Sequence, residues 1–187
     1  MLFFVRHGEV LNPDHVVYAS LDGFDLSPVG EDQADRAGAA LAARNVAAIW
    51  TSPLARARHT ARRIATATGA PVDVDDGLTE WGLSDRWAGV GWDDLHEVFP
   101  GELESYLHDP TDLPFSPESL QAVGERVAAV AQRVVRPDAD VVVVSHQDPI
   151  HAAIRLLTGI GFDDYFHARP EHAEPIGLEP GDPWTLE

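Results

Sequence analysis

The sequence predicts an α/β fold of three layers, with helices on both faces of a largely parallel sheet. Short apolar segments alternate with longer amphipathic segments from the N-terminus to about residue 159. Ser-Pro pairs, which are typical of helix starts, occur at 27–28, 52–53 and 116–117. The chain has 187 residues, of which 44% are apolar, so it can bury one good-sized core. We therefore expect a single domain over residues 1–187.

The N-terminal part of the chain predicts three strands and two helices. In order, they are a strand at 2–5, a helix from Ser27-Pro28 to about Asn45, a strand at 46–50, a helix from Thr51-Ser52-Pro53 to about Thr68, and a short strand at 72–74. This alternation of strands and helices is typical of parallel strands joined by crossover helices.

Residues 76–116 lose clean periodicity and concentrate Trp, Gly, Asp and Pro. We interpret them as an insertion that covers the active face, with short helices near 92–98 and 102–107. The chain then predicts a helix from Ser116-Pro117 to about Arg136, a buried strand at 141–144, a helix from Asp148-Pro149 to about Gly159, and a hairpin of 175–178 with 184–186.

The charge balance limits the partners of the protein. The formal net charge is −18, which disfavours nucleic acid and anionic membrane surfaces as partners. All 13 basic residues are Arg, so an anion site must use guanidinium groups. The chain has no Cys, which excludes thiolate chemistry, and only the short apolar segment 1–5 precedes Arg6, too short for a signal peptide. The cytoplasm is the expected compartment.

Basic side chains follow the predicted strands at the points where these strands end. Arg6-His7-Gly8 follows the first strand, Arg56 follows the second, and His146 follows the strand at 141–144. Ligands of open α/β sheets bind at this rim. We expect Arg6, Arg56 and His146 to surround the oxygens of a phosphoryl group, and the Gly8 amide to be open to an anion.

His7 is the candidate nucleophile of this site. Neighbouring guanidinium charges should lower its pKa and keep the imidazole neutral, so that it attacks phosphorus and becomes a phosphohistidine. Glu80 is the candidate proton donor to the leaving oxygen, because the adjacent Trp81 can desolvate its carboxyl group. Asp85 and Glu9 are alternative acids that the sequence leaves open.

These segments resemble the histidine phosphatase superfamily, the phosphoglycerate mutase-like family. The matching segments run in the family's order: Arg6-His7-Gly8-Glu9 with Asn12, Leu26 to Ala34, Ser52 to Ala61, Leu78-Thr79-Glu80 with Gly82 and Trp87-Ala88-Gly89, and Val144-Ser145-His146. The resemblance covers residues 3 to about 159. It implies that His7 is phosphorylated, that Arg6, Arg56 and His146 bind the phosphoryl group, that Asn12 helps to orient it, and that Glu80 donates the proton.

The chain departs from the family pattern after the last His. The family usually has a Gly there, whereas this chain has Gln147-Asp148-Pro149. The Gln147 amide can still point at phosphate. Asp148 is expected to cap the following helix; if it faced the site instead, it would disfavour strongly anionic substrates. His146 and His151 do not share a helix face, so we expect no metal site.

We therefore expect a metal-independent phosphomonoesterase without a cofactor, acting on a small phosphorylated substrate. By family analogy, α-ribazole phosphate is one such substrate. Two alternatives are a cofactor-dependent phosphoglycerate mutase and a non-catalytic protein that binds phosphorylated ligands. Mutases of the family carry a basic pair after the acid, where this chain has Trp81-Gly82. Trp81, Trp87 and Trp92 are expected to pack the core of the insertion; if they face the site, the substrate has an apolar part.

Overall fold

The computed structural model describes all residues from Met1 to Glu187. Six strands form one sheet in the order β3-β2-β4-β1-β5-β6. The strands are β1 (Leu2–Arg6), β2 (Val46–Thr51), β3 (Val72–Val74), β4 (Asp140–Ser145), β5 (Pro175–Glu179) and β6 (Thr185–Leu186). The first four are parallel to one another, while β5 pairs antiparallel with β1 and with β6. The predicted largely parallel sheet and the C-terminal hairpin are therefore confirmed.

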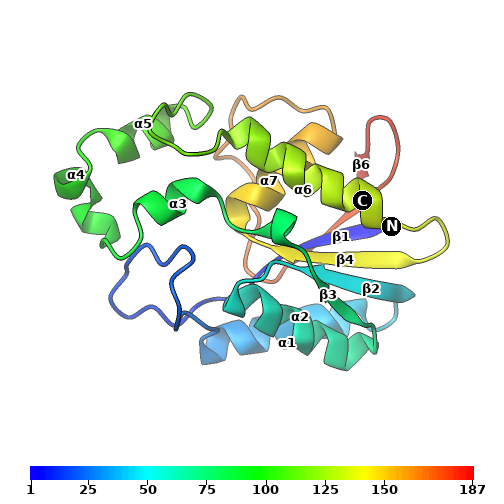
Figure 1. Ribbon diagram of the computed structural model, residues 1–187. Helices are drawn as coiled ribbons and strands as arrows, with labels where there is room; N and C mark the ends of the chain where they lie inside the picture. Colours follow the sequence, from blue (N-terminus) through cyan, green and yellow to red (C-terminus); the bar gives the residue numbers. More distant parts are fainter.

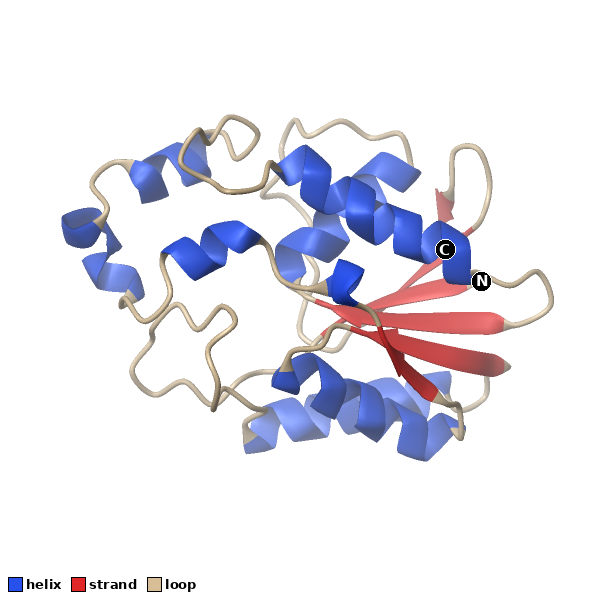
Figure 2. Ribbon diagram, in the orientation of Figure 1, coloured by secondary structure: helices blue, strands red, loops and turns tan.

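Helices cover both faces of the sheet. The long ones are α1 (Pro28–Leu41), α2 (Ala55–Thr68), α6 (Leu120–Val134) and α7 (Gln147–Leu157). In Figure 1, α1 and α2 lie below the strands and α6 and α7 lie above them, and Figure 2 shows the same three layers by type of element. This arrangement confirms the predicted three-layer α/β/α class.

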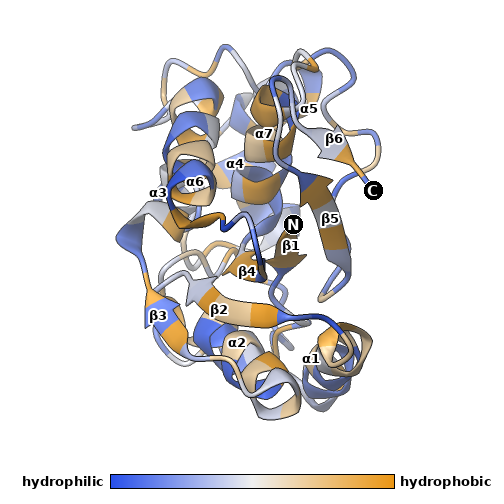
Figure 3. Ribbon diagram, turned by 90° about the vertical axis from the view of Figure 1, so that its right-hand side faces the viewer, coloured by the Kyte–Doolittle hydropathy of each residue, from blue (hydrophilic) through white to orange (hydrophobic).

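Two hydrophobic clusters hold these layers together. One packs α6 and α7 against the sheet through residues such as Phe4, Val127 and Val143, and the other packs α1 and α2 through Val5, Ile64 and Val142. Successive residues of β4 belong alternately to the two clusters, because neighbouring side chains of a strand point to opposite faces. The central strands are accordingly coloured as hydrophobic in Figure 3.

The helical part of residues 76–116 lies beyond the carboxyl ends of the parallel strands, on the left of Figure 1. They contain three helices, α3 (Gly82–Arg86), α4 (Leu95–Val98) and α5 (Glu102–His108), and 3₁₀ turns at Asp76–Leu78 and Trp92–Asp94. The helix α3 is not among the sequence-based expectations. A third hydrophobic cluster, which includes Trp81, Trp87 and Leu95, packs this segment against α6 and α7.

Several predicted helix ends need correction. The helix expected from Ser116 starts at Leu120, because Ser119 is the N-cap and its side chain accepts from the Ala122 amide. The Ser116 hydroxyl instead donates to the Glu118 carbonyl. The helix α1 has the expected cap, Ser27, but ends at Leu41 rather than near residue 45. None of the helices is long and apolar enough to cross a bilayer.

Candidate active site

Three neighbouring strands end side by side and bring their next residues together. Strands β1 and β4 pair in a register that aligns Arg6 with Ser145, so the following residues, His7 and His146, are adjacent. Their ring centroids lie 5.2 Å apart. The amide of Ser52, which follows β2, donates to the Val144 carbonyl and places Ser52 next to the same point. Residues far apart in the sequence thus meet at one rim of the sheet.

His7 is buried and its ring is held in one tautomer. Its Nδ1 atom lies 2.8 Å from the Gly8 carbonyl oxygen. Because a carbonyl only accepts, Nδ1 carries the proton, and Nε2 of the neutral ring keeps its lone pair. Burial, followed by the charges of Arg56 and Arg6, holds the pKa of His7 well below its ordinary value. The ring is therefore neutral at pH 7, as predicted.

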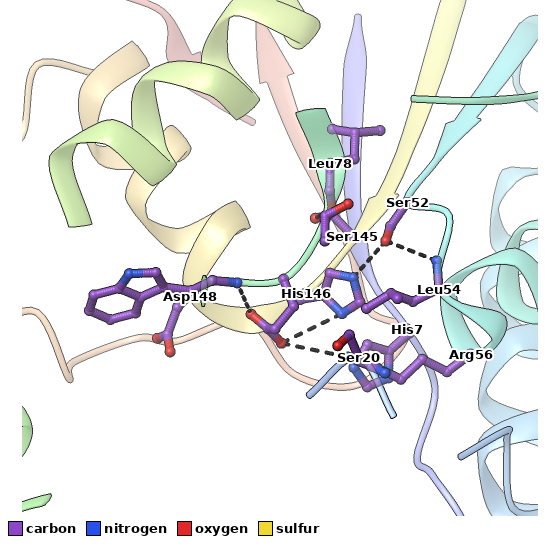
Figure 4. A network of polar contacts seen from close by, with 12 residues as sticks. His7, Ser20, Ser52, Leu54, Arg56, Leu78, Ser145, His146 and Asp148 are labelled. Carbon is purple, nitrogen blue, oxygen red and sulfur yellow. Dashed lines mark hydrogen bonds and ion pairs between the residues drawn. The ribbon is translucent and has the colours of Figure 1, made fainter. Parts of the chain in front are cut away.

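His146 is the buried N-cap residue of α7 and lies between a hydroxyl group and a carboxylate. Its Nε2 atom is 2.8 Å from Oγ of Ser52, and its Nδ1 atom is 3.6 Å from Oε2 of Glu80. The dashed line from the His146 ring to Ser52 in Figure 4 marks the first contact. Burial and the charge of Arg56 lower the pKa of His146 well below its ordinary value, so this ring is also neutral.

Two guanidinium groups lie beside these rings with part of their hydrogen-bonding capacity unused. Arg56 stands in the first turn of α2, is 1% exposed, and has Nη2 3.9 Å from Oε2 of Glu80. Arg6 ends β1 and donates through Nη1 to the Pro170 carbonyl. Four buried nitrogen atoms here have no hydrogen-bond partner: Nε of Arg6, Nε and Nη2 of Arg56, and Nδ1 of His146. Unpartnered buried polar atoms are rare, and the three guanidinium nitrogens among these four favour an anionic ligand.

Glu80 follows the 3₁₀ turn at Asp76–Leu78 and faces both Arg56 and His146. Its Oε1 atom accepts from the Trp81 amide at 2.9 Å. Burial raises the pKa of Glu80 to about 7, and the charge of Asp148 acts in the same direction against that of Arg56. The Trp81 ring is almost fully buried, in line with a desolvating neighbour.

The two alternative acids have other partners. Asp85 accepts hydrogen bonds from the amide and the hydroxyl of Ser20, and Glu9 accepts from the Ser27 hydroxyl. Neither lines the cavity in front of His7. Position and pKa therefore favour Glu80 as the acid.

The expectation that the Gly8 amide is open to an anion is wrong. This amide donates to the Thr60 hydroxyl at 3.0 Å. What the position requires is a residue without a side chain, since a Cβ on Gly8 would lie 2.4 Å from the Gly30 carbonyl oxygen. The glycine lets β1 and the start of α1 approach each other closely.

Asn12 is also engaged locally. Its Nδ2 donates to the Val16 carbonyl, and its Oδ1 accepts from the Val16 amide, so the side chain stabilises its own loop. It borders a separate cavity of about 480 Å³ on the other side of Arg6 and Tyr18. The structure does not bring Asn12 into the cavity in front of His7, and its role in orienting phosphate stays a prediction.

A cavity of about 540 Å³ opens in front of His7. Gln147, the first residue of α7, lines it, and the contact of its amide with phosphate stays a prediction. Of the three Trp residues, Trp81 and Trp87 pack the third cluster, whereas Trp92 is 45% exposed and lines the cavity. The expectation for Trp92 is therefore wrong. The structure contains no group of three or more His, Asp or Glu side chains placed to hold a metal ion.

Asp148 is not the cap of α7, because His146 occupies that position and Asp148 lies in the first turn. Its carboxylate lines the cavity and accepts from Arg169, Tyr106 and Tyr165 at 2.7, 3.1 and 3.2 Å. An N-cap side chain accepts from its own helix, whereas this side chain turns toward other segments. The expectation of a cap is therefore wrong.

Sequence reasoning missed Arg169 and Tyr18 as lining residues. Arg169 lies in the loop after α7, and Tyr18 lies in the loop after β1, with the Arg56 guanidinium 4.8 Å from the centre of its ring. Neither residue belongs to a periodic segment or a motif. Their only signal is type, an Arg and a Tyr in polar loops next to a predicted site.

Comparison with known proteins identifies the family. The model of the histidine phosphatase superfamily (branch 1) matches residues 2–182. An uncharacterized protein of Mycobacterium tuberculosis is 35% identical over 161 residues, which are 83% of this chain and 77% of that protein. Phosphoserine phosphatase 1 of Hydrogenobacter thermophilus is 31% identical over 169 residues, which are 88% of this chain and 79% of that protein.

Solved structures agree with the family match. A mycobacterial glucosyl-3-phosphoglycerate phosphatase in complex with VO3 superposes with a TM-score of 0.87 at 29% identity, covering 100% of this chain and 96% of that one. The resemblance inferred from the five motifs is thus confirmed. The chain belongs to the histidine phosphatase superfamily and is a phosphoesterase of the histidine phosphatase type.

Proposed function

We propose that the protein hydrolyses a small phosphate monoester through a phosphohistidine on His7, without a metal ion. The observation that carries this proposal is the cluster of unpartnered buried nitrogen atoms on Arg6, Arg56 and His146. A phosphoryl group in transfer spreads its charge over three oxygens, and guanidinium and imidazole N–H groups match those oxygens. The neutral His7 ring beside them supplies the nucleophile.

In the first step, Nε2 of His7 attacks phosphorus and the bond to the alcohol oxygen breaks. Protonated Glu80 gives its proton to that oxygen, and the alcohol leaves. In the second step, water attacks phosphorus, the Glu80 carboxylate takes a proton from the water, and the N–P bond breaks. Inorganic phosphate and neutral His7 result. A pKa of about 7 supports both roles of Glu80, because each form is well populated near neutral pH.

Hydrolysis is favoured over mutase chemistry by the charges that line the cavity. A mutase must bind a bisphosphate, which needs cations beyond those around His7. The remaining cation of the cavity is Arg169, and it is already paired with Asp148 at 2.7 Å. A binding protein without turnover is disfavoured, because both a nucleophile and an acid face the same space.

The test is hydrolysis of p-nitrophenyl phosphate in excess EDTA from about pH 5 to 8. We expect turnover that resists the chelator and is lost in His7→Ala. His96→Ala is the matched control, since that side chain is 60% exposed and lies outside the cavity. Turnover retained in His7→Ala, or lost in EDTA, would contradict the proposal.

A panel of natural esters follows the generic assay. It includes α-ribazole phosphate and the phosphoserine and glucosyl-3-phosphoglycerate that the names of the relatives suggest. A mutase would instead need a bisphosphate primer, so phosphoglycerate with and without such a primer separates the two activities. Turnover only in the presence of the primer would favour the mutase.

A further inference from the structure

Arg169 brings a third guanidinium group to the cavity in front of His7. Its Nη2 donates to Oδ1 of Asp148 at 2.7 Å and to the Tyr106 hydroxyl at 2.9 Å. Asp148 is the only carboxylate with which it forms an ion pair. Its Nε is buried without a partner. The side chains of the pair are 23% and 15% exposed, so water screens their attraction only in part.

This arrangement engages both oxygens of the Asp148 carboxylate. Oδ1 accepts from Arg169 and Tyr165, and Oδ2 accepts from Tyr106. Charge-assisted hydrogen bonds of this kind are strong, and separating the pair would leave two partly buried charges unmatched. Asp148 therefore offsets the positive charge of Arg169.

We propose that Asp148 masks Arg169 and so restricts the site to phosphate monoesters whose alcohol part carries no negative charge. This specificity rests on the proposed function, in which the phosphoryl group occupies the donors of Arg6, Arg56 and His146. A second anionic group on the substrate has no uncommitted cation left to bind. At Arg169 it would compete with the carboxylate of Asp148.

The other lining residues fit an uncharged, partly apolar alcohol. Val17, Trp92, Leu103 and Leu107 contribute apolar side chains to the cavity, and Trp92 and Leu107 are 45% and 56% exposed. Asp93 also lines the cavity and pairs with no cation. An aromatic ring can pack on Trp92 and Leu107, whereas a carboxylate there would meet Asp93. A benzyl group is therefore a suitable probe.

The experiment compares two substrates of equal shape, 4-carbamoylbenzyl phosphate and 4-carboxybenzyl phosphate. They have similar leaving oxygens and differ in one negative charge at the far end of the ring. We expect kcat/KM of the wild type to favour the amide about tenfold, the scale of one charged hydrogen bond. In Asp148→Asn, which keeps the shape but removes the negative charge that offsets Arg169, the ratio should fall to about one or reverse.

Two variants separate masking from a general effect of charge. Asp93→Asn removes one negative charge from the same cavity without changing any partner of Arg169. Masking predicts a much smaller change of the ratio in this variant than in Asp148→Asn, and equal changes would overturn it. The double variant Asp148→Asn with Arg169→Gln should lose the gain for the carboxylate, because the freed cation is gone.

A binding measurement keeps the test independent of turnover. The two matching benzylphosphonates, which cannot be hydrolysed, are titrated calorimetrically into the wild type and each variant. If the wild type binds the carbamoyl phosphonate more tightly and Asp148→Asn does not, the result supports masking, even when neither ester is hydrolysed. In that case only the proposed function fails. The masking proposal would be overturned if the wild type bound both phosphonates equally, bound the carboxy phosphonate more tightly, or bound neither.

Discussion

Nδ1 of His146 lies 3.6 Å from Oε2 of Glu80, slightly too far for a hydrogen bond. The same carboxylate oxygen lies 3.9 Å from Nη2 of Arg56. Both nitrogen atoms therefore stand close to Glu80 without bonding to it, which leaves them available to a phosphoryl group. The separation also explains how burial can keep the pKa of Glu80 high beside a guanidinium group.

Glu80→Gln should slow hydrolysis of alkyl phosphates much more than that of p-nitrophenyl phosphate. A nitrophenolate leaves with little help from a proton, whereas an alkoxide needs one. General acid catalysis is worth about 10²- to 10⁴-fold, so we expect a loss of that size for benzyl phosphate and a smaller one for the nitrophenyl ester. Steady-state kcat with both substrates checks this. Equal losses would mean that Glu80 is not the acid.

The pH profile should carry the signature of the same carboxyl group. Glu80 must be protonated to donate its proton in the first step, and its pKa is about 7. Activity toward benzyl phosphate should therefore fall as the pH rises through 7, and this limb should be absent in Glu80→Gln. His7 has a lowered pKa, so its protonation should reduce activity only at more acidic pH. A basic limb at pH 7 that persists in the variant would contradict the assignment.

Glu80 should also make stability depend on pH. Its pKa rises from 4.5 in the unfolded chain to about 7 in the folded protein, so the folded state holds the proton more tightly. The stabilisation is complete below pH 4.5 and is lost as the pH rises through 7. Relative to Glu80→Gln, the free energy of unfolding should fall by about 3 kcal/mol between these limits. Urea titrations of both proteins at several pH values measure it; parallel curves would contradict it.

Gly8→Ala should destabilise the protein by about 2 kcal/mol or more, because the new Cβ would collide with backbone at Gly30. Gly161→Ala is the matched control, since no atom lies within 4 Å of a Cβ at Gly161. Thermal unfolding of the two variants and the wild type gives the comparison. Similar melting temperatures for both variants would show that β1 and α1 adjust to the added methyl group.

The sequence was sufficient to predict the layers and the group of residues that meet at the rim. Alternating apolar and amphipathic segments predict parallel strands, and parallel strands end at one edge. That rule alone brings His7 and His146 together. The Ser27 cap was predictable for the same local reason, since its partner is the amide of Gly30, three residues away.

Residues that reach the site through tertiary packing could not be predicted in this way. Arg169 and Tyr106 meet Asp148 from segments 21 and 42 residues away, and no local pattern encodes those distances. Trp92 and Trp87 lie only five residues apart in the same irregular segment, yet only Trp87 is buried. The choice between Ser116 and Ser119 as a cap depended on how the preceding turns pack.

The first strand has no neighbour until late in the chain. β1 pairs with β4 and β5, which begin at residues 140 and 175. During synthesis, the apolar residues of β1 therefore stay unpaired while most of the polypeptide is made. An unpaired strand is prone to aggregate during this period. His7 and His146 become neighbours only when that pairing forms. Recovery of catalytic activity on refolding would therefore report the closing of this long-range contact.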